Sequence, residues 1–359
     1  MALDAAAAAA PSSGPAPAMA DSGGGLRLLI VSDAWAPQVN GVVRTLSTVS
    51  ALLRRGGDAV EVVGPDRFRT VPAPSYPEIR LAVRPRAALA RMADAFAPTA
   101  VHVATEGPLG WAMRSICMAR GWPFTTSFHT KFPEYLHART GIPPRFAWAV
   151  LRRFHESGAG TFAATPSLRA ELARRGFTKV RAWTRGVDLD LFRPEPRDPW
   201  EGLPRPVFLY AGRVAVEKNI EAFLRLDLPG SKVVVGDGPQ RRALQARFRS
   251  AHFAGWRQGE ALAAAYAGAD VSVFPSRTDT FGLVILEAMA CGTPVAAYPV
   301  TGPLDVIAGS GAGVLDEDLG RAAKAALECD RERCRAHAER YSWAACAEAF
   351  RRQLAPIRS

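Results

Sequence analysis

Short apolar segments alternate with helical segments along almost the whole chain. The runs at residues 26–31, 207–211 and 271–274 are mostly apolar rather than alternating, which is typical of parallel strands buried on both faces. Helical segments such as 42–55 and 168–175 lie between such runs, and parallel strands need crossovers of that kind. The alternation therefore predicts an α/β protein with doubly wound parallel sheets.

The expected strands form two series with a linker between them. Residues 192–199 are rich in proline and charge, as linkers are. We expect two Rossmann-like domains, 26–192 and 193–340, facing a cleft. The first series of strands is expected at 26–31, 59–63, 79–83, 100–103, 124–127, 161–164 and 180–183, and the second at 207–211, 232–236, 251–254, 271–274, 294–297 and 312–315.

The net charge of the chain indicates which classes of partner it favours. Its 359 residues carry a formal net charge of +11, which favours anionic partners such as membrane surfaces, nucleic acid or phosphorylated substrates. A genome rich in G and C would also enrich arginine, so the charge has a second explanation. The five cysteines are an odd number without metal-type spacing, and we interpret them as reduced thiols of a cytoplasmic protein.

Residues 1–25 form a low-complexity leader of mainly Ala, Pro, Ser and Gly. The leader carries Asp4 and no basic residue before Arg27, whereas a signal peptide needs a basic start and an apolar core. We expect it to be disordered, and Met19 offers a second start. No run approaches the ~20 apolar residues of a membrane-spanning helix. We therefore expect a cytoplasmic protein whose membrane contact is peripheral, at the inner face of the cytoplasmic membrane.

A polar loop at residues 276–282 leads from an apolar strand into a helix. Asp279 lies at the mouth of the helix and Glu287 lies inside it. A helix N-terminus suits a phosphate, and carboxylates accept hydrogen bonds from the hydroxyls of a sugar or ribose. The segment therefore predicts a pocket for a phosphorylated sugar.

Four further segments follow strands, where α/β sheets bind ligands. Asn40-Gly41 is either a close backbone approach to a ligand at a helix N-terminus or only a tight turn. His129 is either catalytic or structural, and Arg213 with Lys218 either neutralises a diphosphate or is surface charge. The turn around Gly238 lacks a full GxGxxG, so it is weak evidence for a dinucleotide cofactor.

In this order, over about residues 26 to 355, these segments resemble the retaining glycosyltransferases of family four, which have the GT-B fold. The family usually reads E-x7-E in its last motif, and here Asp279 replaces the first Glu while Glu287 is kept. The resemblance implies an acceptor-side domain at 26–192, a donor domain at 193–340 and a closing helix at 341–359 that crosses back to the first domain. It also implies transfer of a sugar from a nucleotide diphosphate to an acceptor hydroxyl.

The resemblance assigns roles to individual residues. Arg213 and Lys218 would hold the diphosphate and stabilise its growing charge, so no metal and no cofactor is expected. His129 would contact the donor sugar near the reacting carbon. Asp188-Leu189-Asp190 looks like the DxD metal site of the other glycosyltransferase fold, but it follows a loop typical of this family. The expected catalytic residues are His129, Arg213, Lys218 and Asp279, and the expected donor-binding residues are Gly41, Arg213, Lys218, Gly238, Phe281, Gly282, Leu283 and Glu287.

The segments 40–46, 183–188 and 277–282 are most similar to the glycolipid-forming branch of the family. That branch includes sulfoquinovosyl- and glucosyl-diacylglycerol synthases and GDP-mannose-dependent mannosyltransferases. Residues 131–156 place apolar and aromatic groups beside arginines, which suits an anionic bilayer surface; the alternative is a core helix with a solvated basic face. The expected acceptor and membrane contacts are Phe132, Tyr135, Arg145, Trp148, Arg152 and Arg153.

The sequence thus predicts transfer of glucose or glucuronic acid from a UDP-sugar to diacylglycerol, with retained α configuration. One alternative is a GDP-mannose-dependent mannosyltransferase acting on a lipid or an oligosaccharide. A non-enzyme alternative is a basic nucleic-acid-binding protein, which the ordered donor motifs argue against, and we expect no nucleic-acid partner. A third is membrane tethering without catalysis.

Overall fold

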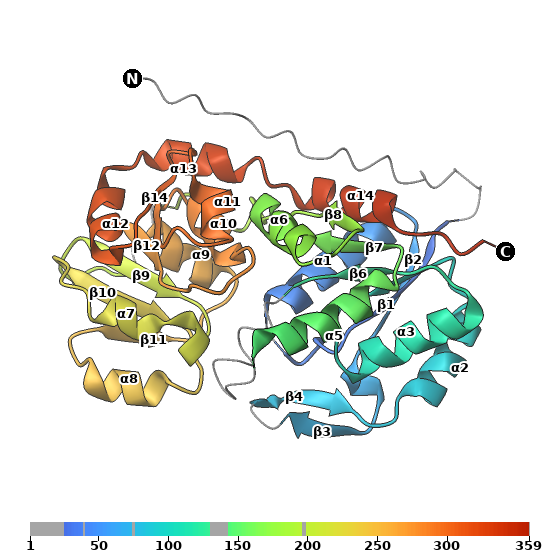
Figure 1. Cartoon of the computed structure of the whole chain (residues 1–359). Coiled ribbons are helices and arrows are strands. Elements are labelled where there is room, and N and C mark those ends of the chain that lie inside the picture. The colour runs from blue at the N-terminus through green and yellow to red at the C-terminus, as the bar shows by residue number, and fades with distance from the viewer. Residues whose placement is uncertain (1–24, 39, 74–75, 130–142, 196–198, 359) are drawn as a thin grey trace.

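The computed structural model describes residues 25–38, 40–73, 76–129, 143–195 and 199–358, so almost all of the predicted leader lies outside the described residues. Two six-stranded sheets carry the fold, one in each half of the chain. Helices cover both sheets, and the two halves lie side by side (Figure 1). The two parallel-sheet, Rossmann-like domains confirm the predicted fold class.

The N-terminal sheet has the strand order β2-β1-β5-β6-β7-β8, and all its pairings are parallel. Four consecutive residues of β1 are fully buried, as expected of a central strand covered on both faces. Its strands are β1 Arg27–Val31, β2 Ala59–Val63, β5 Ala100–Val103, β6 Thr125–Ser127, β7 Gly160–Ala163 and β8 Val180–Ala182, and its helices are α1 Gly41–Arg55, α2 Arg86–Phe96, α3 Pro108–Arg120, α5 Pro144–Glu156 and α6 Pro166–Arg174.

One expected strand lies outside this sheet. The segment expected at 79–83 forms part of β4 (Tyr76–Ala82), which pairs antiparallel with β3 (Thr70–Ala73) as a two-stranded hairpin. Val71 at 49% exposure and the exposed Arg80 belong to this hairpin. Side chains as exposed as these two do not suit a strand of the central sheet, where both faces are covered.

The C-terminal sheet has the order β11-β10-β9-β12-β13-β14 and is also parallel throughout. In each domain the strand order reverses beside the first strand, and α/β sheets bind ligands at the carboxyl ends of strands there. The strands are β9 Val207–Ala211, β10 Ser231–Val235, β11 His252–Gly255, β12 Val271–Phe274, β13 Val295–Ala297 and β14 Gly313–Leu315, and the helices are α7 Ile220–Leu224, α8 Arg241–Arg247, α9 Glu260–Ala267, α10 Leu283–Ala290, α11 Pro303–Ile307, α12 Leu319–Ala325 and α13 Arg331–Ala338.

The last helix, α14 (Trp343–Gln353), packs on the N-terminal domain although it follows the whole C-terminal domain in sequence (Figure 1). Its Phe350 is fully buried, with its ring centroid 4.7 Å from that of Trp183. The Trp183 indole N–H donates to the Cys346 carbonyl at 3.1 Å, and Arg351 pairs with Asp58 at 2.9 Å. Helix α14 therefore closes one face of the N-terminal core. Within the described ranges, no helix is long and apolar enough to cross a membrane.

Candidate active site

Direct contacts join the two domains at the turns that carry the sequence motifs. The Thr280 hydroxyl donates to the His129 carbonyl at 2.7 Å, and a Cβ built on Gly41 would lie 3.5 Å from Cδ1 of Leu283. On the same boundary, the Ser167 hydroxyl donates to Asp305 at 3.0 Å. The structure thus brings together the loops after β1, β6 and β12, which the sequence places far apart.

The two helices that face this boundary have different N-termini. The Asn40 side chain accepts hydrogen bonds from the N–H groups of Val42 and Val43, both at 3.0 Å, so it caps α1. Helix α10 begins after Gly282, has no side-chain cap, and Gly282 has a left-handed φ of 85°. Because the first N–H groups of a helix lack partners within it, the N-terminus of α10 is the better anion site of the two.

The loops after β9 and β12 bring a predicted cation and a predicted carboxylate together. The ammonium of Lys218 lies 2.6 Å from Oδ1 of Asp279, and both side chains are mostly buried. The second oxygen of Asp279 is buried and has no hydrogen-bond partner among the described residues. A buried acceptor without a partner is unfavourable, so Asp279 has one oxygen in place for a ligand hydroxyl.

Two features position the basic loop. The side-chain amide of Asn219 donates to the Pro275 carbonyl at 3.1 Å, which ties this loop to the end of β12. The buried Tyr210 hydroxyl donates to the Arg213 carbonyl at 2.7 Å. Burial, together with the nearby Asp279 and Glu217 carboxylates, raises the pKa of Tyr210 well above its usual value. Tyr210 therefore stays a hydrogen-bond donor and holds the backbone of the half-buried Arg213.

The glycines after β10 serve close backbone packing. A Cβ on Gly236 would lie 1.8 Å from the Gly212 carbonyl oxygen, and one on Gly238 would lie 2.4 Å from that of Val214. Both glycines have positive φ. The predicted donor residue Gly238 thus holds the β10 turn against the loop that carries Arg213.

Glu287 is not an open ligand group in this structure. Its side chain is 4% exposed, and one carboxylate oxygen pairs with the guanidinium of Arg44 from α1. The other oxygen accepts a hydrogen bond from the Tyr266 hydroxyl at 3.4 Å. Burial raises the pKa of Glu287, and Arg44 opposes that rise. Glu287, which was expected to bind the donor, therefore forms an ion pair between the domains.

His129 is held by a residue that the sequence reasoning did not select. Its Nδ1 lies 3.1 Å from Nη2 of Arg185, and its ring packs against the edge of Trp183. Its Nε2 is buried and has no partner in the part of the chain that the structure describes. Burial, followed by the charges of Arg185, His102 and His155, lowers the pKa of His129 well below its usual value. His129 is therefore neutral at physiological pH.

Several expected site residues lie elsewhere or act differently. Phe281 is 5% exposed and belongs to the C-terminal core, so only its backbone can reach a ligand. Phe132 and Tyr135 lie outside the described residues. The Asp188 side chain accepts hydrogen bonds from the backbone N–H groups of Asp190 and Leu191, and these bonds form a local turn. Within the described residues, no group of three or more His, Cys, Asp or Glu is arranged to hold a metal.

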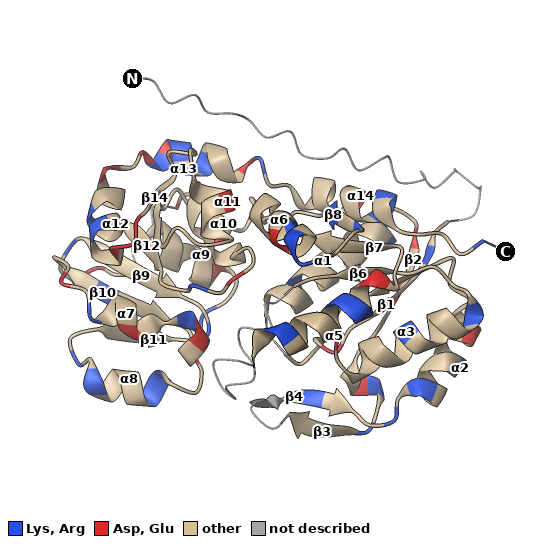
Figure 2. Ribbon diagram, viewed as in Figure 1, with Lys and Arg blue, Asp and Glu red and all other residues tan. Residues whose placement is uncertain are grey.

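The expected membrane surface on α5 changes at one position. Trp148 is 5% exposed, because it stacks on Phe128 at 5.5 Å and lies under the guanidinium of Arg175 at 3.9 Å. Its assignment to the membrane surface was wrong, since Trp148 belongs to the core. The exposed side chains of α5 instead include Phe146, Val150, Arg145, Arg152 and Arg153, and Figure 2 shows the basic residues along this helix.

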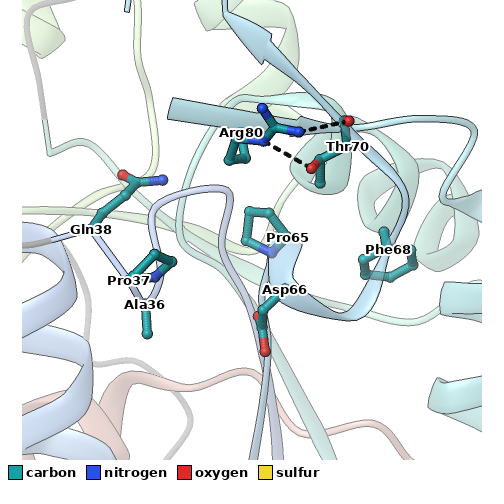
Figure 3. Close-up of a pocket in the computed structure, with 8 residues that line it drawn as sticks. All are labelled: Ala36, Pro37, Gln38, Pro65, Asp66, Phe68, Thr70 and Arg80. Atoms are coloured by element: carbon teal, nitrogen blue, oxygen red, sulfur yellow. Dashed lines mark hydrogen bonds between the residues drawn. The ribbon is translucent and has the colours of Figure 1, made fainter. Parts of the chain in front are cut away.

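A pocket of about 140 Å³ lies in the N-terminal domain beside the loop that leads into α1. One wall is Ala36, Pro37 and Gln38 from that loop, and the other comes from the segment that follows β2, with Pro65, Asp66 and Phe68, and from the β3–β4 hairpin (Figure 3). Arg80 donates to the Thr70 hydroxyl at 3.0 Å across the hairpin. Asp66 adds a carboxylate to the lining. The pocket offers polar groups of both signs next to the domain boundary.

Two Rossmann-like domains that meet at their ligand-binding turns, with Lys218 paired to Asp279 in the loop before α10, have the arrangement of the GT-B glycosyltransferase fold. The chain belongs to glycosyltransferase family 4. Residues 39–191 match the family model described as "Glycosyltransferase Family 4", and residues 205–329 match the family model described as "Glycosyl transferases group 1".

Curated relatives agree with this assignment. A GDP-mannose-dependent alpha-mannosyltransferase of Mycolicibacterium smegmatis is 35% identical over 81% of this chain and 84% of its own length. Sulfoquinovosyl transferase SQD2 of Arabidopsis thaliana is 30% identical over 75% of this chain and 58% of its own length. An alpha-monoglucosyldiacylglycerol synthase of Streptococcus pneumoniae is 26% identical, over 76% and 71%.

Solved structures share the fold. Sucrose-phosphate synthase from Thermosynechococcus elongatus aligns with a TM-score of 0.73 and 21% identity over 90% of this chain and 96% of that one. HepE from Anabaena, in complex with UDP and glucose, aligns with a TM-score of 0.68 and 16% identity over 91% and 98%.

Proposed function

We propose that the protein transfers a hexose from a nucleoside diphosphate sugar to a hydroxyl of a lipid acceptor at a membrane surface. The observation that carries the proposal is the uncapped N-terminus of α10, with Lys218 and Asp279 paired beside it. A diphosphate would replace the Asp279 carboxylate as the partner of Lys218. The freed carboxylate would then accept hydrogen bonds from sugar hydroxyls.

The reaction creates negative charge on the leaving diphosphate. Lys218, Arg213 and the N–H groups of α10 would stabilise that charge in the transition state. Because two side-chain cations and a helix N-terminus supply this stabilisation, the mechanism we propose uses no metal. We assign no protein nucleophile, and we propose same-face attack by the acceptor, with the leaving phosphate accepting the proton and the anomeric configuration retained.

The acceptor would approach from the N-terminal domain. The pocket beside residues 36–38 has polar groups for a headgroup, and it adjoins the loop that leads to Gly41. The exposed Phe146 and Val150, at 56% and 52%, lie among arginines on α5. Apolar side chains within a basic surface suit shallow insertion into an anionic bilayer. The protein would therefore work as a peripheral enzyme on the cytoplasmic face of a membrane.

Two donors are the candidates. The sequence pointed first to a UDP-hexose, but the M. smegmatis relative, with an alignment over 81% of this chain, is named for GDP-mannose. We therefore place GDP-mannose first. The relative named for monoglucosyldiacylglycerol keeps a UDP-hexose with a diacylglycerol acceptor as the second candidate.

The test combines purified protein with GDP-mannose, UDP-glucose, UDP-glucuronate or UDP-galactose and anionic liposomes containing diacylglycerol. Products are followed by mass spectrometry with and without EDTA, and their anomeric configuration is read by NMR. Absence of lipid product from every donor would refute the lipid acceptor, and loss of all activity with EDTA would refute the metal-free mechanism.

A matched pair of lysine variants tests the diphosphate site. Lys218→Ala should lower kcat about 100-fold or more, as does removal of one preorganised donor from a charge-stabilising site. Lys324→Ala, on an exposed position of α12, should leave kcat unchanged. Equal activity of the two variants would remove Lys218 from the proposed mechanism.

A further inference from the structure

We propose that Arg185 is a positioning residue that fixes His129 in the Nε2–H tautomer and directs that N–H at the donor sugar. The proposal rests on the proposed function for the identity of the ligand, but its first step concerns only the free protein. The relevant contact is the 3.1 Å approach of Arg185 Nη2 to His129 Nδ1.

A guanidinium can only donate hydrogen bonds. Nδ1 of His129 must therefore accept, and the single proton of the neutral ring lies on Nε2. Burial lowers the pKa of Arg185 to about 10, so the guanidinium stays charged at neutral pH and keeps this role. Arg185 thus sets the tautomer of His129, because the hydrogen bond made by one ring nitrogen of a histidine determines which of the two nitrogens carries the proton.

Arg185 is itself held in place. Its Nη1 donates to the carbonyls of Trp183 at 2.8 Å and Thr184 at 3.1 Å, and its guanidinium carbon lies 4.3 Å from the centroid of the Trp183 ring. The residue is 5% exposed. None of the ion pairs found among the described residues includes it, so the guanidinium is used for hydrogen bonds and ring stacking rather than for a carboxylate.

The other ring nitrogen of His129 has the opposite surroundings. Nε2 is buried, and the described residues offer it no partner. A buried N–H without an acceptor is unfavourable, so the geometry leaves a donor in place for a hydroxyl of the ligand. Because Thr280 of the C-terminal domain bonds the backbone carbonyl of His129 at 2.7 Å, the residue that carries this N–H lies at the domain boundary where the donor would bind.

The charged and titratable neighbours make a second role for His129 unfavourable. His102 uses both nitrogens on Thr125 and Ser127, and His155 bonds Thr126 and Glu106. Together with burial and Arg185, the two histidines hold the pKa of His129 low. His129 is then a neutral donor across the physiological range and does not act as a general base.

The first experiment measures the tautomer in the full-length wild-type protein by NMR with ¹⁵N-histidine labelling. The His129 signals are assigned by their loss in His129→Gln. The expected result is a protonated Nε2 and a non-protonated Nδ1 between pH 6 and 8. A protonated Nδ1, or an imidazolium in this range, would overturn the proposal. The readout needs no substrate, so it is independent of whether any sugar transfer is found.

The second experiment uses variants of Arg185. Arg185→Met removes the donor, and it should lower kcat about tenfold to a hundredfold through one weakened hydrogen bond in the transition state, with little change in the KM for the donor sugar. Arg185→Lys keeps a charged donor and should restore part of the loss. Arg333→Met, at an exposed arginine of α13, is the matched control and should behave as wild type.

A double-variant cycle separates positioning from a structural role. If Arg185 acts through His129, Arg185→Met should change kcat less than twofold when His129 is already Gln. An equal loss of kcat in both backgrounds would show that Arg185 acts on the fold and would refute the positioning role. If no donor sugar reacts even with wild type, the proposed function fails, and the tautomer measurement still decides this inference.

Discussion

The ion pair between Arg44 and Glu287 gives a prediction whose size can be worked out from burial. Arg44→Met keeps most of the aliphatic stem and removes the charge. It leaves a carboxylate that is 4% exposed and whose remaining hydrogen-bond partner, among the residues that the structure describes, is the Tyr266 hydroxyl at 3.4 Å. The pair bridges the two domains, so its loss should weaken both the fold and the approach of the domains to each other.

The magnitude lies between two limits. Breaking a fully buried pair costs about 3–5 kcal/mol, and exposed pairs contribute about 0.2–1 kcal/mol. Glu287 is buried, but the Arg44 side chain is 36% exposed, so solvent screens part of the attraction. We expect Arg44→Met to lower the free energy of unfolding by about 2 kcal/mol at pH 7.

The loss of stability should depend on pH. Arg44 lowers the raised pKa of Glu287, so removing Arg44 raises that pKa further. A carboxyl group whose pKa is higher in the folded state than in the unfolded state destabilises the fold at high pH, where the group is charged. This destabilisation disappears as the pH falls through the folded-state pKa towards the unfolded-state pKa, because the group is then protonated. The destabilisation by Arg44→Met should therefore be largest at neutral pH and shrink as the pH approaches the ordinary value of 4.5.

The assay is urea unfolding followed by tryptophan fluorescence at pH 7 and pH 5, for wild type, Arg44→Met, Glu287→Gln and the double variant. In the double variant, the neutral Gln should restore at least half of the stability lost in Arg44→Met. If Arg44→Met loses less than about 0.5 kcal/mol at pH 7, as a screened surface pair would, or loses equal amounts at both pH values, the buried-charge reasoning is wrong.

Two further predictions concern the membrane surface and the glycine turn. Replacing both Phe146 and Val150 by Ser should weaken binding to anionic liposomes in a flotation assay at least tenfold, since about 0.8 kcal/mol is lost for each CH₂ removed from the bilayer, while activity on a water-soluble acceptor analogue stays near wild type; unchanged flotation would place the membrane contact elsewhere. Gly236→Ala should destabilise the C-terminal domain by about 3 kcal/mol or more. Its φ of 142° is unfavourable for alanine, and the new Cβ would lie 1.8 Å from the Gly212 carbonyl oxygen. A thermal midpoint within 2 °C of wild type, roughly the shift that a destabilisation of under 1 kcal/mol produces, would contradict this prediction.

The sequence was most informative where burial and local pattern coincide. Each strand expected in the second series has a counterpart among β9 to β14, and the fully buried β9, β12 and β13 leave the mostly apolar runs that strands covered on both faces produce. The hairpin strand β4 was harder to place, because an exposed two-stranded hairpin does not need an apolar run. Trp148 was misplaced because an aromatic residue on an amphipathic helix suits the core as well as a membrane, and only the packing of Phe128 and Arg175 decides between them.

The site was predicted in its parts rather than in its contacts. Lys218 and Asp279 were each selected from their local motifs, but their 2.6 Å pairing joins two different strands. Arg44 and Arg185 lay within segments that were recognised, yet nothing near them in sequence indicates Glu287 or His129 as their partners. Long-range pairs of this kind depend on the docking of the domains and on loop geometry. They leave no periodic pattern in a single sequence, so they could not be predicted from it.

Helix α14 has a consequence for the order in which the protein is made and folded. Phe350 and Cys346 complete the core around Trp183, and roughly 160 residues separate the end of β8 from the start of α14. At about 5–20 residues per second, the ribosome takes about 8–30 s to add them. During that interval the face of the N-terminal core that α14 covers remains exposed, so the first domain to be synthesised is the last to be completed.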